Sequence, residues 1–208
     1  MKYNAVSNEA TDYFFSRFLY GPYIKDKESH SAWMVNPDVA FGELYTDTAD
    51  IRLKTIISDP NSSEPMLLKY NKVNYYDPNA PSTYVVDNNL VMLRLADIYL
   101  LKAEAAFKTG DETTALEALN VVKDRAAITA SVNTGADLWD EILEERRREL
   151  IGEGVNAYDF IRMEKLGEYF SAFTPDRIEK KGYYWPLDMR TLLPQAPLLT
   201  QNEWWKNH

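Results

Sequence analysis

The sequence contains no cysteine, and its 208 residues include only two histidines, His30 and His208. The absence of cysteine excludes disulfides and thiolate metal sites. One histidine lies in a charged stretch and the other is the last residue, so they indicate no imidazole site. A calcium site could draw on Asp47, Asp50 and Asp59, but the Asp-x-Asp-x-Asp-Gly loop that would support it is missing. We therefore expect no metal and no cofactor.

Positive charge and long apolar runs are also scarce. The net charge of -9 argues against a nucleic-acid partner, because binding to phosphates requires a basic surface. No apolar run reaches the length of a membrane span, and the first residues lack the charged-then-apolar pattern of a signal peptide. Neither a Gly-x-Ser-x-Gly motif nor a Gly-rich phosphate loop is present, so the common nucleophile and nucleotide motifs are excluded.

What the sequence does contain is a central series of helical patterns. The first spans Leu90–Lys108 and is apolar on nearly all sides, which is typical of a buried helix. Its few charged residues fall mostly within one narrow arc: Arg94, Asp97, Glu104 and Lys108. Gly110 can end this helix in the left-handed conformation, and Asp111 or Thr113 can cap the next one.

The second helix has a periodic apolar face, which predicts an antiparallel hairpin with the first. The residues of this face recur at spacings of three and four: Ala115, Leu119, Val122 and Ala126, with Leu116 and Ala118 beside them.

A third helix is predicted near Asp137–Ile151, with an arginine on its apolar stripe. The stripe consists of Trp139, Leu143, Arg146 and Leu150. A buried guanidinium requires a carboxylate partner. Glu149 is the local candidate, and Glu153 and Asp159 are candidates beyond the Gly152–Gly154 turn.

After that turn the pattern predicts another helix over Val155–Arg162. Tyr158, Ile161 and Phe160 are its inward-facing residues.

Four motifs in this region follow one another in the order found in a known family. The segments are Leu93–Asp97 with Leu100 and Ala103–Ala105, then Gly110–Asp111 to Asp124–Ala126, then Glu145–Leu150 with Glu153–Gly154 and Asp159–Arg162, then Trp185–Leu187 with Leu199–Asn202. The first, third and fourth resemble the "LRxADxxLxxAEA", "ERRxEL…EGxRxxDLxR" and "LPIP…LxQNPGY" segments of the SusD/RagB nutrient-binding lipoproteins of gut Bacteroidetes, and the second resembles the helix that follows the first. Asp50–Arg52 resembles the family's "DxR" element. Departures occur at turns: Val155–Asn156, Asp188 and Glu203–Trp204.

The resemblance implies a mainly all-α fold of TPR-like helical hairpins, with long loop insertions and a Pro-rich extended tail. It also implies that the chain corresponds to the C-terminal region of a family member, because members are roughly twice as long. Within this single region, 1–208, we expect a loop-rich aromatic part (1–88), a helical core (89–170) and an extended tail (171–208). Family members are lipoproteins at the cell surface, held in the outer membrane by an N-terminal lipid. The signal peptide and anchor are expected to lie outside this sequence.

Outside the helical core the pattern is less regular. Phe41–Tyr45 is a plausible short helix, Met66–Tyr70 is expected to be a strand, and Tyr75–Pro81 to be a loop. The aromatic residues of the tail are expected to pack on the helices: Tyr183, Tyr184, Trp185, Trp204 and Trp205.

The resemblance implies that the protein binds a nutrient, expected to be an oligosaccharide, and delivers it to a SusC-like TonB-dependent porin. Aromatic rings on loops can stack on sugar rings while polar side chains bond the hydroxyls. The candidate ligand-binding residues are Trp33, Tyr75 and Tyr76, with Asn74 and Asp77 as polar companions.

The charged residues of the helical core are interpreted as a structural ion network rather than as catalytic groups. Its members are Arg94, Asp97, Glu104, Arg146, Glu149 and Asp159. We therefore expect that the protein is not an enzyme. Two alternatives remain open at this point. A glycan hydrolase would need two carboxyl groups about 5 to 10 Å apart across a cleft, and a TPR-type adaptor would bind a peptide or protein on a concave helical surface.

Overall fold

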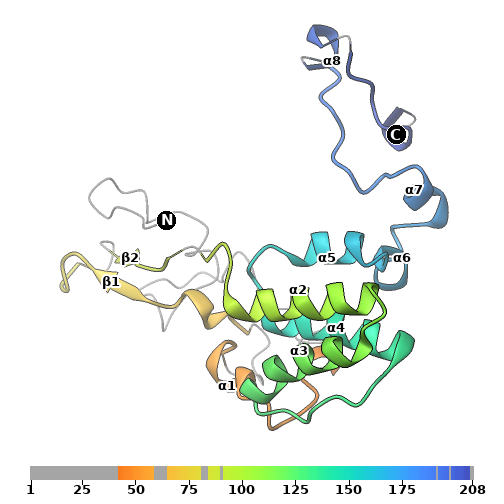
Figure 1. The fold of residues 1–208 in the computed structure, drawn as a ribbon. Coiled ribbons are helices and arrows are strands. Elements are labelled where there is room, and N and C mark those ends of the chain that lie inside the picture. The colour runs from red at the N-terminus through yellow and green to blue at the C-terminus, as the bar shows by residue number, and fades with distance from the viewer. Residues whose placement is uncertain are drawn as a thin grey trace. The chain divides into compact units, whose positions relative to one another are not determined.

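In the computed structural model, residues 42–58, 65–80, 84–89, 91–190, 192–196 and 198–206 are described. They form two compact units, one ending at Gly154 and the other starting at Val155. The first unit contains a bundle of three helices, a short helix and a two-stranded ribbon (Figure 1). The second contains short helices only. The described chain is mainly helical, as the sequence predicts.

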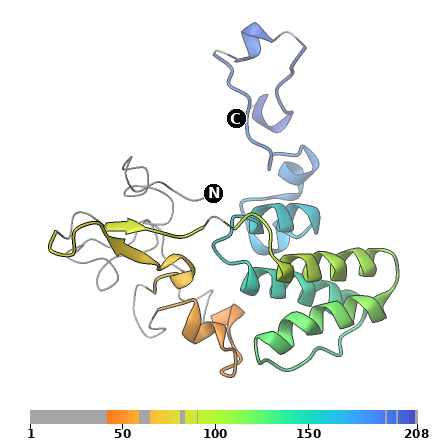
Figure 2. The ribbon, with the colours of Figure 1, turned by 60° about the vertical axis from the view of Figure 1, so that its left-hand side comes forward.

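Helices α2 (Leu95–Lys108), α3 (Glu112–Arg125) and α4 (Gly135–Glu149) lie side by side and provide the core of the first unit (Figures 1 and 2). The predicted hairpin of the first two helices is present. Its apolar face is buried as expected: Ala115, Ala118, Leu119, Val122 and Ala126. Gly110 ends α2 with a φ of +82°, and Asp111 caps α3 by accepting a hydrogen bond from the Thr114 backbone N–H at 3.0 Å.

Helix α2 differs from the prediction in its start and in the face that it buries. Arg94 is extended, so the helix begins at Leu95 rather than Leu90. The side of the helix that carries Asp97 and Glu104 is buried, whereas Leu95 is 70% exposed. The prediction of a helix buried on nearly all sides is therefore wrong. The reason is that a buried arginine on α4 requires a carboxylate, which turns the polar arc of α2 inward.

Helix α4 confirms the predicted stripe. Trp139, Leu143, Arg146 and Leu150 are all buried. The turn that follows contains Gly152 and Gly154 at φ values of +75° and +80°, in the left-handed region that glycine tolerates.

The segments before α2 form more structure than the sequence predicts. A single π-helical turn covers residues 42–44, and α1 is Arg52–Thr55. Met66–Tyr70 is not a strand. Leu67 makes an isolated antiparallel bridge with Ile57, and Leu68–Tyr70 is a 3-10 helix.

The predicted loop over Tyr75–Pro81 is confirmed for residues 76–80, but it connects the strands of a β-hairpin that the sequence did not predict, and Tyr75 belongs to the first strand. Strand β1 (Val73–Tyr75) pairs antiparallel with β2 (Tyr84–Val86), and Tyr75 lies opposite Tyr84. This pairing was missed because each strand has only three residues, too few to show a period-2 pattern.

The second unit contains α5 (Asn156–Arg162), α6 (Leu166–Tyr169), α7 (Pro175–Glu179), α8 (Leu192–Gln195) and a 3-10 helix, Trp204–Lys206. In α5, Phe160 is buried against the rings of Tyr169 and Phe170, with centroids 4.9 and 5.0 Å away. Tyr158 is 69% exposed, so its predicted inward position is wrong. Helix α5 buries Asp159 and Phe160 instead, and Met163, directly after its end, is also buried.

The aromatic residues of the tail pack around an arginine. The Arg177 guanidinium lies over the rings of Phe173, Trp204 and Trp205, at 4.4, 5.5 and 5.6 Å from their centroids. Trp185, by contrast, is 92% exposed. The expectation that Trp185 packs on the helices is wrong, and Tyr184 is also 53% exposed.

Among the described residues, no helix combines the length and apolar character needed to cross a membrane.

Candidate functional site

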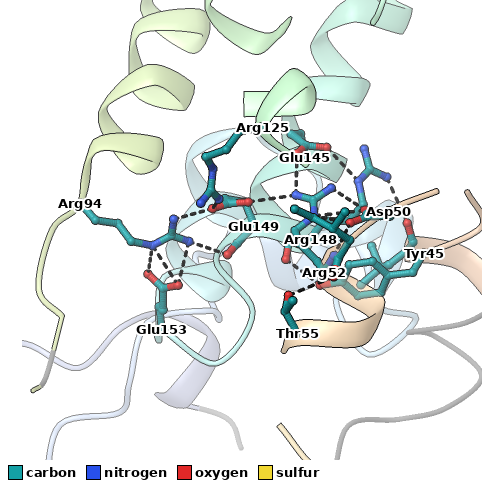
Figure 3. A network of polar contacts seen from close by, with 12 residues as sticks. Tyr45, Asp50, Arg52, Thr55, Arg94, Arg125, Glu145, Arg148, Glu149 and Glu153 are labelled. Atoms are coloured by element: carbon teal, nitrogen blue, oxygen red, sulfur yellow. Dashed lines mark hydrogen bonds and ion pairs between the residues drawn. The ribbon is translucent and has the colours of Figure 1, made fainter. Parts of the chain in front are cut away.

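A dense cluster of charged side chains lies at the C-terminal end of α4 (Figure 3). We call it the Glu149 network. Its members are Asp50, Arg52, Lys69, Arg94, Arg125, Glu145, Arg148, Glu149 and Glu153. They come from α1 and its flanks, the residues on either side of the hairpin, the end of α3, α4 itself and the following turn. The network therefore connects segments that are far apart in the sequence.

Glu149 accepts hydrogen bonds from three guanidinium groups. Arg52 Nη1 donates to its Oε2 at 3.0 Å, Arg94 Nη1 donates to its Oε1 at 2.5 Å, and Arg125 Nη2 donates to the same Oε1. The side chain of Glu149 is only 2% exposed. A carboxylate this deeply buried depends on such partners to remain charged.

Arg52 pairs with three carboxylates of the network, Asp50, Glu145 and Glu149. Its Nε and Nη2 donate to Asp50 at 2.8 and 2.7 Å, and Nη1 also donates to Glu145 Oε1 at 2.7 Å. Burial acts to lower the pKa of Arg52, but the hydrogen bonds with Asp50 and the negative charge of Glu145 outweigh it and raise the pKa. Arg52 therefore carries a permanent charge that fixes α1 against α4.

Arg94 and Lys69 hold the backbone at the end of α4. Arg94 Nη2 and Lys69 Nζ both donate to the carbonyl oxygen of Glu149, at 2.5 and 2.6 Å. Both also pair with Glu153, Arg94 through Nε at 2.9 Å and Lys69 through Nζ at 2.5 Å. Two cations thus bind the negative end of the helix dipole.

The Lys69–Glu153 pair has perturbed pKa values. Burial lowers the pKa of Lys69 to about 8, although the charge of Glu153 acts in the opposite direction. Burial acts to raise the pKa of Glu153, but hydrogen bonds from Arg94 and the charge of Lys69 outweigh it and lower the pKa. Both groups are therefore charged near neutral pH.

The network borders a cavity of about 270 Å³. The charged side chains on its wall are Arg52, Lys69, Arg94, Arg125, Glu149 and Glu153, and Tyr70, Thr55, Ile51, Ile56, Val91 and Ala126 complete the lining. Tyr70 precedes β1 and Val91 follows β2. The cavity therefore lies at the open end of the hairpin, opposite its turn, and we call this end the foot of the hairpin.

The structure gives the core residues partners that differ from those expected. Arg146 lies 2.9 Å from Asp97, a carboxylate absent from the three candidates of the sequence analysis. Glu149 is engaged by Arg52, Arg94 and Arg125. In the second unit, Asp159 accepts from Arg162 at 2.9 Å, and in the first unit Glu104 is buried on α2.

Several members of the network were not identified from the sequence, namely Asp50, Arg52, Lys69, Arg125, Glu145 and Arg148. Arg52 had a signal, since it belongs to the Asp50–Arg52 element. Lys69 had none, because the segment around it was expected to be a strand.

The hairpin carries the predicted ligand-binding residues that are described. Val73, Tyr75 and Tyr84 lie on one face of the ribbon because they occupy alternate or directly paired positions. Asn74 lies on the other face, where its Nδ2 donates to Asp87 at 3.3 Å and Lys72 pairs with Asp87 at 2.9 Å. Tyr75 and Asn74 therefore do not lie on a common face of the ribbon.

The remaining candidates lie beyond these paired positions. Tyr76 and Asp77 are exposed in the turn, where Asp77 Oδ1 accepts from the backbone N–H of Asn79 at 2.9 Å. Trp33 lies outside the described residues.

The chemistry available to the network is limited by its pairing. Glu145 accepts from Arg52 and Arg148, and Glu144 accepts from Arg147 at 2.7 Å, so these adjacent carboxylates are held in ion pairs. Asp50 is bound to Arg52, and within the described part of the chain no group of three or more His, Cys, Asp or Glu side chains is arranged to hold a metal ion.

Comparison with known proteins finds relatives that share the fold and the sequence pattern of this chain. The sequence profile of the SusD family matches residues 41–205. SusD-like protein P38 of Formosa agariphila is 35% identical over 173 residues, covering 77% of this chain and 33% of that protein. The starch-binding protein SusD of Bacteroides thetaiotaomicron is 32% identical over 91 residues, which cover 43% of this chain and 16% of that protein.

Solved structures agree with these relatives. A SusD homolog from Bacteroides thetaiotaomicron superimposes with a TM-score of 0.73 at 26% identity, and the match covers 92% of this chain and 42% of that one. A second SusD superfamily protein from the same organism gives a TM-score of 0.70 at 26% identity, over 93% of this chain and 42% of that one. The chain spans about a third of the length of the first curated relative. With the helical hairpin, the Glu149 network and the tail all inside the matched region, the chain belongs to the SusD family.

Proposed function

We propose that the protein binds an oligosaccharide at the outer surface of a bacterial cell and delivers it, uncleaved, to a SusC-like TonB-dependent porin in the outer membrane. Membership of the SusD family supports this, as does the similarity to a protein named for starch binding. On the same grounds we place the protein at the outer membrane as a lipoprotein held by an N-terminal lipid.

The observation that carries the proposal is the pair of tyrosines on one face of the hairpin. Tyr75 and Tyr84 are directly opposite each other, and side chains in such positions have Cβ atoms about 5 Å apart. Both are half-buried, so their rings are held in place without being hidden. Two neighbouring rings on one face offer an apolar surface on which the C–H face of a pyranose can stack.

Binding without chemistry is supported by the state of the carboxylates in the helical core. Those near the cavity, Glu149 and Glu153, each accept hydrogen bonds from two or more cations. A general acid needs a raised pKa, whereas the pKa of Glu153 is lowered.

A glycan array followed by calorimetry tests the proposal. We expect the full chain to bind an oligosaccharide and leave it intact, and we expect Tyr75→Ala and Tyr84→Ala each to weaken binding at least about tenfold, as the loss of an aromatic stacking contact and its buried area implies. Tyr158→Ala is the matched control, since Tyr158 is an exposed tyrosine of the second unit.

Equal affinity of all three variants would refute the role of the hairpin. Cleavage of the bound glycan by the wild-type chain, lost on replacement of a carboxylate, would favour the hydrolase alternative.

A further inference from the structure

The Glu149 network contains one more cation than carboxylates among the described residues. Its cations are Arg52, Lys69, Arg94, Arg125 and Arg148, and its carboxylates are Asp50, Glu145, Glu149 and Glu153, so five positive charges face four negative ones. In a chain with a net charge of -9, this local excess is unusual and lies next to a cavity.

Arg125 makes fewer hydrogen bonds with described residues than any other arginine of the network. Arg52 and Arg94 use Nε, Nη1 and Nη2 in ion pairs. Arg125 donates through Nη2 to Glu149, and its guanidinium makes no other hydrogen bond with a described residue. Its side chain is 62% exposed, the largest exposure of any arginine in the network. Most of its planar donor fork is therefore open to a ligand.

The cavity has room for one charged group and part of a sugar ring. Its volume of about 270 Å³ is just below the range of roughly 300–1,000 Å³ typical of small-molecule sites. Arg125 provides donors at its wall, and the apolar side chains of Ile51 and Val91 lie beside it. An arginine fork binds a carboxylate or a sulfate through two parallel hydrogen bonds, which is stronger than its contact with a neutral hydroxyl.

We infer that this cavity binds the anionic group of an acidic sugar, a carboxylate or a sulfate ester, with Arg125 as the principal contact. The inference rests on the proposed function, because the cavity lies at the foot of the hairpin that carries Tyr75 and Tyr84. It narrows the substrate class from oligosaccharides in general to acidic glycans.

The test uses the full chain and three small probes: sodium sulfate, sodium glucuronate and glucose. We expect sulfate and glucuronate to shift the Nε–H resonance of Arg125 in an NMR titration, and glucose to leave it unchanged. Arg125→Gln should weaken binding of both anions at least about tenfold, since a hydrogen bond to a charged group contributes about that factor or more. Arg125→Lys should give an intermediate loss, because it retains the charge without the fork.

The matched control is Lys54→Gln, which removes one positive charge from the same unit at an exposed position outside the cavity. It should bind the anions as the wild type does. The inference fails if neither anion shifts the resonance, if glucose shifts it equally, or if Arg125→Gln binds the anions with unchanged affinity.

Failure of the inference is distinguishable from failure of the proposed function. An oligosaccharide bound through Tyr75 with equal affinity in its neutral and acidic forms would remove the anion site and leave the proposed function standing. Sulfate and glucuronate bound at Arg125, together with an oligosaccharide affinity unaffected by Tyr75→Ala and Tyr84→Ala, would support the anion site and refute the role of the hairpin. Anions bound at Arg125 by a chain that binds no oligosaccharide would refute the proposed function.

Discussion

Replacement of Glu149 by glutamine should destabilise the protein more than the loss of any single exposed ion pair would. Glutamine has almost the same shape, so the change removes the negative charge and one of the two carboxylate oxygens without leaving a cavity. Arg52, Arg94 and Arg125 all donate to that carboxylate, whose side chain is 2% exposed. Removing one partner of a buried ion pair costs about 3–5 kcal/mol, because the remaining charge stays buried without compensation.

The expected loss for Glu149→Gln lies near the lower end of that range, about 3 kcal/mol. Arg52 retains Asp50 and Glu145, and Arg94 retains Glu153, so neither guanidinium is left without a carboxylate. Exposed Arg125 can turn to solvent.

The assay is urea unfolding followed by far-UV circular dichroism, with the free energy of unfolding extrapolated to water. Glu168→Gln is the matched control, since Glu168 pairs with Lys165 at an exposed i,i+3 position of the second unit. It should cost less than about 1 kcal/mol. Equal, small losses for Glu149→Gln and Glu168→Gln would refute the view that the network is a main source of stability.

Two further predictions concern the turn after α4 and the titration of Lys69. A Cβ at Gly152 would lie 2.1 Å from Leu67 Cδ2, whereas one at Gly154 meets nothing within 4 Å, and both residues have positive φ. In the same unfolding assay, Gly154→Ala should cost about 1–2 kcal/mol from backbone strain, and Gly152→Ala about 1–3 kcal/mol more from overpacking, so equal losses would contradict the turn geometry. For Lys69, the folded pKa of about 8 is below the ordinary value of 10.5, so between these values the unfolded chain binds more protons and stability rises with pH. The difference in unfolding free energy between wild type and Lys69→Met should therefore shift in favour of the wild type between pH 7.5 and pH 10.5, and a shift the other way would exclude a lowered pKa.

The helical core could be predicted from the sequence because its signals are local. Gly110 and Asp111 mark the boundary between α2 and α3, and the spacing of Ala115, Leu119 and Val122 gives the buried face of α3. These features depend on backbone conformation and helical periodicity, which a single sequence displays directly.

The ion network was only partly predictable because charge pairing is decided by tertiary packing. The need of Arg146 for a carboxylate follows from its position on an apolar stripe, but the choice of Asp97 depends on how α2 packs against α4. Lys69 reaches Glu153 across 84 positions of the chain, a pairing that no local pattern indicates.

The candidate site was predictable in residue type but not in geometry. The aromatic residues around Tyr75 made this segment a candidate, and it stays a prediction. The pairing of Tyr75 with Tyr84 could be known only from the structure of the hairpin. Only that pairing shows that Asn74 faces away from Tyr75.

The attachment of α1 to α4 has a consequence for the order in which the first unit loses structure. A helix of four residues is too short to persist alone in water, so α1 exists only while Arg52 is held by Glu145 and Glu149. Opening α1 by itself would take Arg52 away from two buried carboxylates, Glu145 and Glu149, which makes independent fraying costly. This short segment should therefore unfold together with the bundle and share its resistance to proteolysis, despite having almost no helical stability of its own.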